Sequence, residues 1–327
     1  MKSLSLSLSL ASLVPLANPA QGPAEAVELS DSVVEALTEE PAEEGEELVA
    51  DATGRSVLAG EVLENYQGQT VADLFRQLPG VSGVSEGGRQ NFRPNIRGQE
   101  GSGRVAVDID GAPQNFFNTN HGANSNRLSI DSSLLKSVEV KRGAAANKSG
   151  QGSSSGSISF STIDPADLLT EGERLGGRTK TFYESNGDGR GLVLAGAVQA
   201  SEALSFLAAG SYKLYDDYED GDGETIIGSE TESVSSLAKA VYSPDDYQEL
   251  KLSYLFTKQN FLGSENFAQG LQRNGTLREE DVQIDTVTLN YTNEFAGNDW
   301  LDLELTTFYS RTDRERTDRG ASSPTSL

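Results

Sequence analysis

A single histidine, His121, supplies the only imidazole of this 327-residue chain. It lies in the stretch QNFFNTNHGANSN, residues 114 to 126, which also holds five asparagines and the pair Phe116 and Phe117. A neutral imidazole can bind a metal ion or move a proton, whereas asparagine-rich segments favour turns in solvated loops. The stretch is therefore either a polar loop with a solvated histidine, or a loop that presents this histidine to a bound molecule.

Other sets of chemically capable residues are weak. A protease or phospholipase needs a cluster of acid, base and nucleophile, and one histidine in a loop predicts no such cluster, so we expect no enzyme. The chain has no cysteine, which excludes disulfides and thiolate metal sites. Asp108 and Asp110 flank a strand and its turn, so we expect structural roles for both. The acidic run Asp216 to Glu224 lacks the distal glutamate of a calcium loop and predicts an exposed loop.

The charge balance restricts the partners. The sequence has 50 acidic and 26 basic residues, a net charge of -24. A nucleic-acid-binding protein needs a basic face, so we expect no nucleic acid partner.

The N-terminus has the pattern of a targeting segment. Residues 1–20 carry Lys2 at their start, continue through a Leu/Ser/Ala/Val run and end in small residues, which predicts a secretory signal peptide. Residues 21–46 follow with many carboxylates and no Lys or Arg. Such a composition cannot bury enough apolar surface to fold, so we expect a disordered acidic linker.

Residues 54–170 predict a small α+β domain. The segment Val71 to Leu78 reads as a short helix with Thr70 as its N-cap and Pro79-Gly80 as its stop. Strands are expected at Arg104 to Ile109, before a turn at Asp110-Gly111, and in segments 134–143 and 156–164. Mixed short helices and strands with long polar connections are typical of this class.

Residues 176–327 predict about seven antiparallel strands, the last ending at Arg311. Apolar and polar residues alternate strictly, as in ELKLSYLFT, where Leu250, Leu252 and Tyr254 share a face opposite Lys251 and Ser253. Short turns alternate with long polar loops at 216–233 and 259–282. This rhythm favours a transmembrane β-barrel over a large soluble β-sandwich. Seven strands cannot close a barrel, so we expect the sequence to be part of a longer barrel.

Five segments in this order resemble the plug domain of TonB-dependent outer-membrane receptors. They are LPGV (78–81), NIRGQ (95–99), VAVDIDGAPQ (105–114), LLKSVEVKRGAAA (134–146) and GSISFSTIDPADLL (156–169). The resemblance implies an α+β plug domain followed by antiparallel strands of a truncated 22-stranded transmembrane β-barrel. It also implies the outer membrane of a Gram-negative bacterium as location, with contact to outer-membrane lipid.

The resemblance also gives roles to charged and extended segments. ELVADAT is similar to a TonB box, the segment that binds TonB and, through it, ExbB and ExbD; its residues are Glu47, Leu48, Val49, Ala50, Asp51, Ala52 and Thr53. An unpaired segment of this kind can add as a strand to a partner's sheet. The pattern alone favours the start of the next domain, and it is the resemblance that favours the TonB box. Arg97 and Arg142 are expected to pair with acids of the barrel wall and dock the plug.

Within the family, segments 130–143 and 161–189 look most like receptors for haem, haemoglobin, transferrin or lactoferrin. This implies haem, free or taken from a haem-carrying protein, as transported ligand, with no intrinsic cofactor. His121 then becomes a candidate axial ligand of haem iron, Phe116 and Phe117 candidate porphyrin contacts, and Asn118 and Asn120 candidate donors to the propionates. Ferric-siderophore import is the alternative, and a surface binding protein that does not transport is a third hypothesis.

Overall fold

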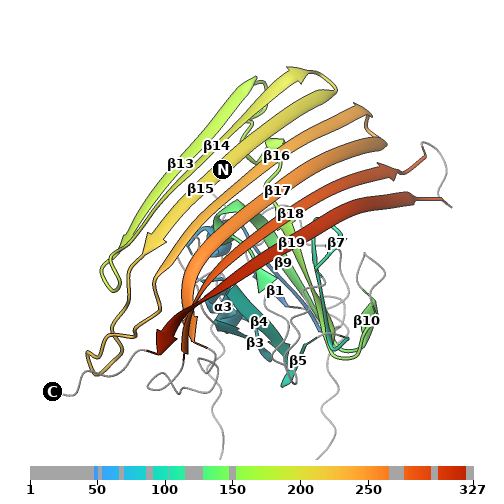
Figure 1. The fold of residues 1–327 in the computed structure, drawn as a ribbon. Helices are drawn as coiled ribbons and strands as arrows, with labels where there is room; N and C mark the ends of the chain where they lie inside the picture. The colour runs from blue at the N-terminus through green and yellow to red at the C-terminus, as the bar shows by residue number, and fades with distance from the viewer. Residues whose placement is uncertain are drawn as a thin grey trace, which may run out of the picture. The chain divides into compact units, whose positions relative to one another are not determined.

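The computed structural model describes residues 48–50, 54–65, 70–85, 91–101, 103–114, 128–146, 152–264, 276–295 and 301–321. All of them belong to one compact unit, Ala42–Leu327. The predicted signal peptide and acidic linker lie outside the described residues. Figure 1 shows short strands and helices in the first half of the chain and long, curved strands in the second half.

The N-terminal domain, residues 48–170, is built on a six-stranded mixed sheet. Its strand order is β1-β2-β9-β12-β6-β7, in which only the β12–β6 pair is parallel. The strands are β1 (Leu48–Ala50), β2 (Arg55–Ala59), β9 (Leu135–Arg142), β12 (Gly156–Thr162), β6 (Val105–Ile109) and β7 (Ala112–Pro113).

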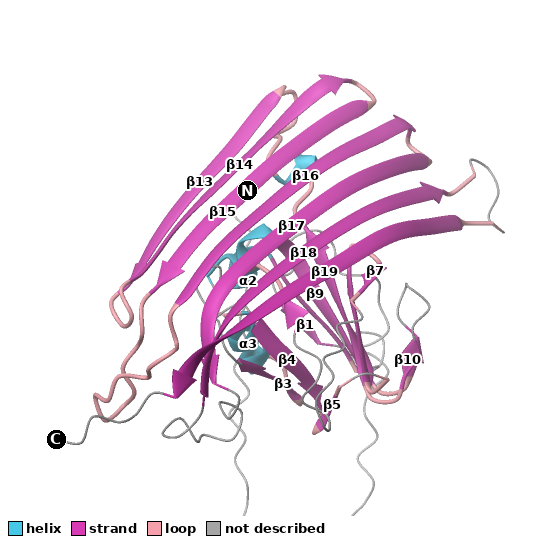
Figure 2. Cartoon of the chain, in the orientation of Figure 1, coloured by secondary structure: helices cyan, strands magenta, loops and turns pink. Residues whose placement is uncertain are grey.

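Shorter elements complete the domain. They are α2 (Gly60–Asn65), α3 (Val71–Leu74), η1 (Phe75–Gln77), β3 (Val81–Ser85), β4 (Asn91–Ile96), β5 (Gln99–Glu100), β8 (Leu128–Ser129), η3 (Ser132–Leu134), β10 (Ala145–Ala146), β11 (Gly152–Ser153) and η4 (Pro165–Asp167). Strands dominate, and the helices of the described residues are short (Figure 2). None of these helices combines the length and apolar character needed to cross a membrane.

The helix predicted at Val71 to Leu78 is present in shorter form. Thr70 caps it as expected, with its hydroxyl accepting from the Asp73 backbone N–H at 3.2 Å and the Asp73 carboxylate accepting from the Thr70 backbone N–H. After one turn the α-helix tightens into η1, a common way to end before a Pro-Gly pair. The apolar residues that share one face of this segment are buried: Val71, Leu74, Phe75 and Leu78.

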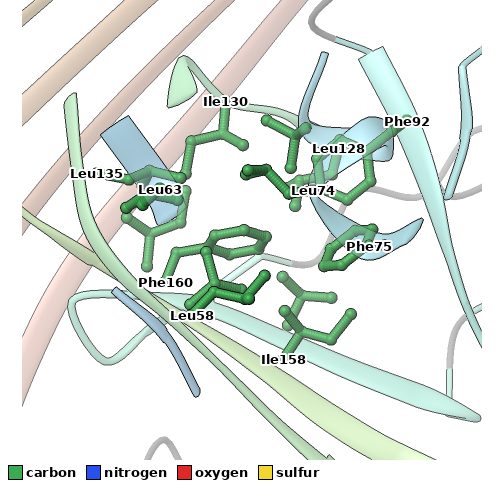
Figure 3. Close-up of a cluster of buried hydrophobic side chains, with 14 of the residues drawn as sticks. Leu58, Leu63, Leu74, Phe75, Phe92, Leu128, Ile130, Leu135, Ile158 and Phe160 are labelled. Carbon is green, nitrogen blue, oxygen red and sulfur yellow. The ribbon is translucent and has the colours of Figure 1, made fainter. Parts of the chain in front are cut away.

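Three phenylalanines form the centre of the domain core (Figure 3). The ring centroids of Phe75, Phe92 and Phe160 lie 5.5, 6.4 and 6.0 Å apart in tilted and edge-to-face pairs. Leu58 of β2 and Ile158 of β12 are fully buried beside them. The core therefore packs η1 against β4 and against β12 of the six-stranded sheet.

The second half forms one antiparallel sheet, β13 to β19, in chain order. Its strands are β13 (Leu175–Glu184), β14 (Gly189–Ser201), β15 (Leu204–Tyr215), β16 (Thr231–Asp245), β17 (Gln248–Ser264), β18 (Thr276–Asn293) and β19 (Leu303–Ala321). Seven strands, and the alternation of short and long connections, agree with the prediction. We call the face that carries Ser211, Lys213 and Lys239 the inner face, and the opposite face the outer face.

The predicted faces are confirmed on the outer side. Leu252 and Tyr254 are 48% and 41% exposed, whereas their neighbour Ser253 is 3% exposed. The inner face is less uniformly polar than expected, because Leu207, Leu237 and Leu255 point inward and join the core of the N-terminal domain. Burial against that domain replaces contact with water at these positions.

Two predicted boundaries were wrong. The segment 259–282 is mostly strand, because β17 continues to Ser264 and β18 starts at Thr276. The last strand runs ten residues beyond Arg311. The residues of both extensions do not follow the apolar–polar alternation, so the pattern did not predict them as strands. Charged side chains contact one another across these strands: the Glu280 carboxylate accepts from Arg314 and pairs with Arg316.

Phe160→Ala should destabilise the N-terminal domain by about 3–5 kcal/mol, because it removes the ring that contacts both other phenylalanines and leaves a cavity. Guanidinium unfolding of the complete receptor in detergent, followed by limited proteolysis of this domain, measures the change. Phe160→Leu, which keeps most of the apolar volume, should lose much less. Equal midpoints for the wild type and both variants would contradict this account of the core.

Candidate functional site at the junction of domain and sheet

Three sets of polar contacts, here called ties, join the N-terminal domain to the sheet. The first tie centres on Asp131. This residue caps η3, where its Oδ1 accepts from the Ser133 backbone N–H at 2.9 Å. From β15, Lys213 Nζ donates to the same Oδ1 at 2.6 Å, and the Ser211 hydroxyl donates to Oδ2. The side chains of Asp131 and Lys213 are 1% and 2% exposed. The carboxylate is thus surrounded by donors from both parts of the chain.

Complete burial disfavours the charged form of Asp131. The ammonium of Lys213 and the hydrogen bonds from Lys213, Ser211 and Ser133 outweigh that burial and hold the pKa of the carboxyl below its ordinary value. The Asp131 carboxyl is therefore ionised at neutral pH, and its ion pair with Lys213 compensates its charge out of contact with water.

The second tie is at Asp164, between β12 and η4. Lys239 Nζ donates to its Oδ1 and Lys251 Nζ to its Oδ2, both at 2.9 Å. Lys239 also donates to the Thr162 carbonyl at 3.0 Å and lies 3.5 Å from Asp110 Oδ2. Burial disfavours the ionised Asp164, but the two ammonium groups hold its pKa below the ordinary value. Strands β16 and β17 therefore both bind the segment at Asp164, through which the chain leaves the domain core.

A backbone turn makes the third tie. Asp110 and Gly111 have φ of 50° and 82°, so both adopt the left-handed region. Asn290 Nδ2 donates to the Asp110 carbonyl at 3.1 Å. The φ of Gly111 favours glycine, and a Cβ at this position would also make a tight contact, 3.1 Å, with Thr306 Cγ2.

The ion pairs of the first two ties have their lysines on the sheet and their carboxylates on the domain. The prediction had placed the cations on the domain and the acids on the sheet. Arg142 instead donates to the carbonyls of Pro79 and Gly54, at 2.7 and 3.0 Å, and to Ser56 Oγ at 2.9 Å, all within the domain. Arg97 is an exposed turn residue with φ of 52°. The lysines were missed, although each occupies an inward position of a strand whose outward residues are mostly apolar.

The segment predicted as a TonB box is partly described. Leu48, Val49 and Ala50 form β1, which pairs antiparallel with β2 in the register Leu48–Leu58, Val49–Val57 and Ala50–Ser56. β1 is the terminal strand in the sheet order. Glu47, Asp51, Ala52 and Thr53 lie outside the described residues. Backbone pairing at the end of a sheet is compatible with both interpretations of this segment, as a TonB box and as the start of the N-terminal domain.

The candidate haem contacts fall outside the described part of the chain: Phe116, Phe117, Asn118, Asn120 and His121. The segment that contains them begins after Gln114, whose backbone N–H donates to the Val107 carbonyl at 2.8 Å. It ends before β8, which pairs with β4. Their roles as ligand contacts stay predictions.

The other acidic residues have structural partners. Asp108 accepts from Ser159 Oγ at 2.7 Å, and Asp110 accepts from both the backbone N–H and the hydroxyl of Thr162, at 2.9 and 2.6 Å. In the β15–β16 connection, Asp217 Oδ1 accepts from the Ser229 N–H at 2.7 Å. Within the described ranges, no group of three or more potential metal ligands is formed.

Comparison with known proteins gives a consistent pattern. Residues 49–157 match the family model described as the TonB-dependent receptor plug domain. The protein named Heme transporter BhuA of Brucella suis biovar 1 is 33% identical over 269 residues, which cover 82% of this chain and 39% of that protein. TonB-dependent heme receptor A of Haemophilus influenzae is 28% identical over 282 residues, with 79% and 37% covered.

A solved structure agrees with these relatives. It is a double mutant of the Serratia marcescens hemophore receptor HasR in complex with its hemophore HasA and heme. The TM-score is 0.72 at 28% identity, covering 83% of this chain and 39% of that one. The FrpB iron transporter of Neisseria meningitidis, at 20% identity and a TM-score of 0.64, shares the fold. The chain spans about two fifths of the length of the curated relatives it matches.

Lys213→Met should weaken the attachment of the N-terminal domain by about 3–5 kcal/mol, because it leaves the buried Asp131 charge without its partner. Guanidinium midpoints of the complete receptor, read by proteolysis of this domain, test the change. Lys258→Met on the exposed side of β17 is the control and should have little effect. The double variant Lys213→Met with Asp131→Asn should recover part of the loss. A single variant that matches the control would show that the pair does not hold the domain.

The pH response follows from Asp131 and Asp164, whose pKa values are both below 3.8 in the folded chain. A lowered pKa stabilises the fold above the unfolded value, and this stabilisation is lost as the pH falls through the folded pKa. Attachment should thus be constant near neutrality and weaken in acid, as the pH falls from the unfolded pKa of these carboxyls through the lower folded pKa. Guanidinium midpoints of the complete receptor, measured from neutral to acidic pH, test it, and Asp131→Asn should reduce the pH dependence. An identical profile in that variant would exclude Asp131 as a source.

Proposed function

The chain belongs to the TonB-dependent receptors and corresponds to the N-terminal part of one, and on this premise we propose that it serves active import of haem across the outer membrane of a Gram-negative bacterium. The supporting observation is the similarity, over about four fifths of the chain, to proteins named as heme transporters and receptors. Haem, free or from a haem-carrying protein, is the cargo in this proposal.

The arrangement of charges suits a domain that occupies the inside of a transport channel. Its ties to the inner face are ionic and polar at Asp131, Asp164 and the Asp110 carbonyl. The outer face presents apolar side chains such as Leu252, as a lipid-facing surface requires. In this proposal the domain is the plug that closes the channel until energy reaches it.

Energy would come from TonB, together with ExbB and ExbD. Glu47 to Thr53 is the proposed contact, because an extended segment can form a strand with a partner. β1 already adopts the strand conformation at the end of the plug sheet. No covalent chemistry is required of the chain in this process.

In the haem proposal His121 is the axial ligand of the iron, Phe116 and Phe117 contact the porphyrin, and Asn118 and Asn120 donate to the propionates. Relatives that import ferric siderophores would use the same fold with other contacts. The solved receptors of that kind are similar at the level of fold, for example the siderophore receptor PirA of Acinetobacter baumannii at 19% identity and a TM-score of 0.56.

An absorbance titration of haem into the complete receptor tests the cargo and the ligand together. We expect a Soret band in the wild type that shifts or weakens in His121→Ala, since loss of the axial imidazole changes the iron's ligand field. Asn124→Ala, in the same stretch, is the control and should behave as wild type.

The other outcomes are equally informative. Saturable haem binding that ignores the histidine substitution would keep haem as cargo and remove the ligand role of His121. No specific haem band in the wild type would remove the haem proposal and place ferric-siderophore import first.

A further inference from the structure

Two aromatic rings lie together on the inner face of the sheet, close to where β13 and β15 end. The ring centroids of Phe182 and Tyr215 are 6.0 Å apart, and their planes differ by 28°, which is a stacked arrangement. Tyr215 is buried, whereas part of Phe182 is exposed. β13 starts at Leu175, directly after the connection from the plug, so the rings lie toward the other end of these strands.

Two glycines of β14 make room for the rings. Phe182 is opposite Gly191 in the ladder, and a Cβ on that glycine would lie 2.2 Å from Phe182 Cε1. A Cβ on Gly189 would lie 2.6 Å from Tyr215 Cδ1. A side chain at either position would push the ring above it away from the sheet. The strand therefore allows both rings to lie close to its backbone, with Tyr215 buried and Phe182 partly exposed.

The rings also contact the first tie between plug and sheet. Lys213 Nζ is 5.8 Å from the Phe182 ring centroid, within the range of a cation–π interaction. The same ammonium donates to Asp131 Oδ1 at 2.6 Å. One lysine thus connects a partly exposed aromatic surface to a buried carboxylate of the plug.

We propose that Phe182, backed by Tyr215, is a stacking surface for a planar aromatic cargo of the porphyrin class, and that its occupation is transmitted through Lys213 to Asp131. The inference rests on the proposed function for the identity of the cargo. A flat ring above a glycine offers a porphyrin an aromatic face, and cargo that shifts this ring changes the position of the ammonium over it. The pair of rings is then both a contact for the cargo and a sensor of its presence.

Metal-free protoporphyrin IX is the probe that separates stacking from iron ligation. Fluorescence titration of the complete receptor should give a dissociation constant about three- to tenfold weaker for Phe182→Leu than for wild type, since the aromatic contact is lost while apolar bulk stays. Tyr212→Leu is the matched control, because Tyr212 lies on β15 but on the outer face, 45% exposed. Phe182→Tyr, which keeps a ring, should bind as wild type and shows that the site tolerates substitution.

Unchanged binding by Phe182→Leu would overturn the stacking surface and leave the rings as packing over two glycines. Haem bound normally in that case would still support the proposed import function. Failure of the wild type to bind either haem or protoporphyrin would overturn both proposals.

The transmitted effect has its own measurement. Hydrogen exchange of the backbone amides of residues 131–134 should change when protoporphyrin binds to wild type and should not change in Phe182→Leu at matched occupancy. Binding without any change in these amides in wild type would overturn the role of Lys213 as connection.

Discussion

The buried pairing of sheet lysines with plug carboxylates is the interaction on which the rest of this structure depends. An ammonium and a carboxylate are each costly to remove from water, and only close pairing with further hydrogen bonds offsets that cost. Asp131 and Asp164 meet this condition, because each accepts from two sheet side chains. The plug is therefore held against the sheet by a few polar contacts and does not need an apolar interface across its whole surface.

These ties also fix the local geometry around them. The left-handed turn at Asp110-Gly111 lets the plug backbone approach Asn290 and Thr306. The apolar part of the junction lies between the polar ties, where Leu207 and Leu237 join the plug core. Lys213 belongs to two environments, the ion pair with Asp131 and the ring of Phe182. Lys213 therefore links the Phe182 ring on the sheet directly to the Asp131 carboxylate of the plug.

The inner and outer faces of the sheet differ in the side chains they carry. Outward residues of β15 to β17 are mostly apolar, with a few polar pairs on the same face such as Tyr254 with Asp285. Inward residues vary with the part of the plug that they contact. Inward lysines of the sheet lie opposite plug carboxylates, as Lys213 does opposite Asp131. Inward leucines, such as Leu237, pack on the apolar core of the plug. This explains why the inner face is mixed although strict alternation suggested a polar wall. The extensions of β17 to β19 have polar and charged residues on both faces, and they are held by backbone pairing and by Glu280 with its arginines.

The sequence by itself determined the class of the molecule, because local rules produce it. A cap residue followed by a helical face predicted Thr70 and α3, and strict alternation predicted seven antiparallel strands and their outward side chains. Only the tertiary structure decided which charges meet. Asp131 and Lys213 are 82 residues apart, and no local pattern distinguishes such a pair from Arg142, which turned out to hold its own domain together. Long-range electrostatic pairing depends on the position of both partners in space, so it appears only once the strands are in register.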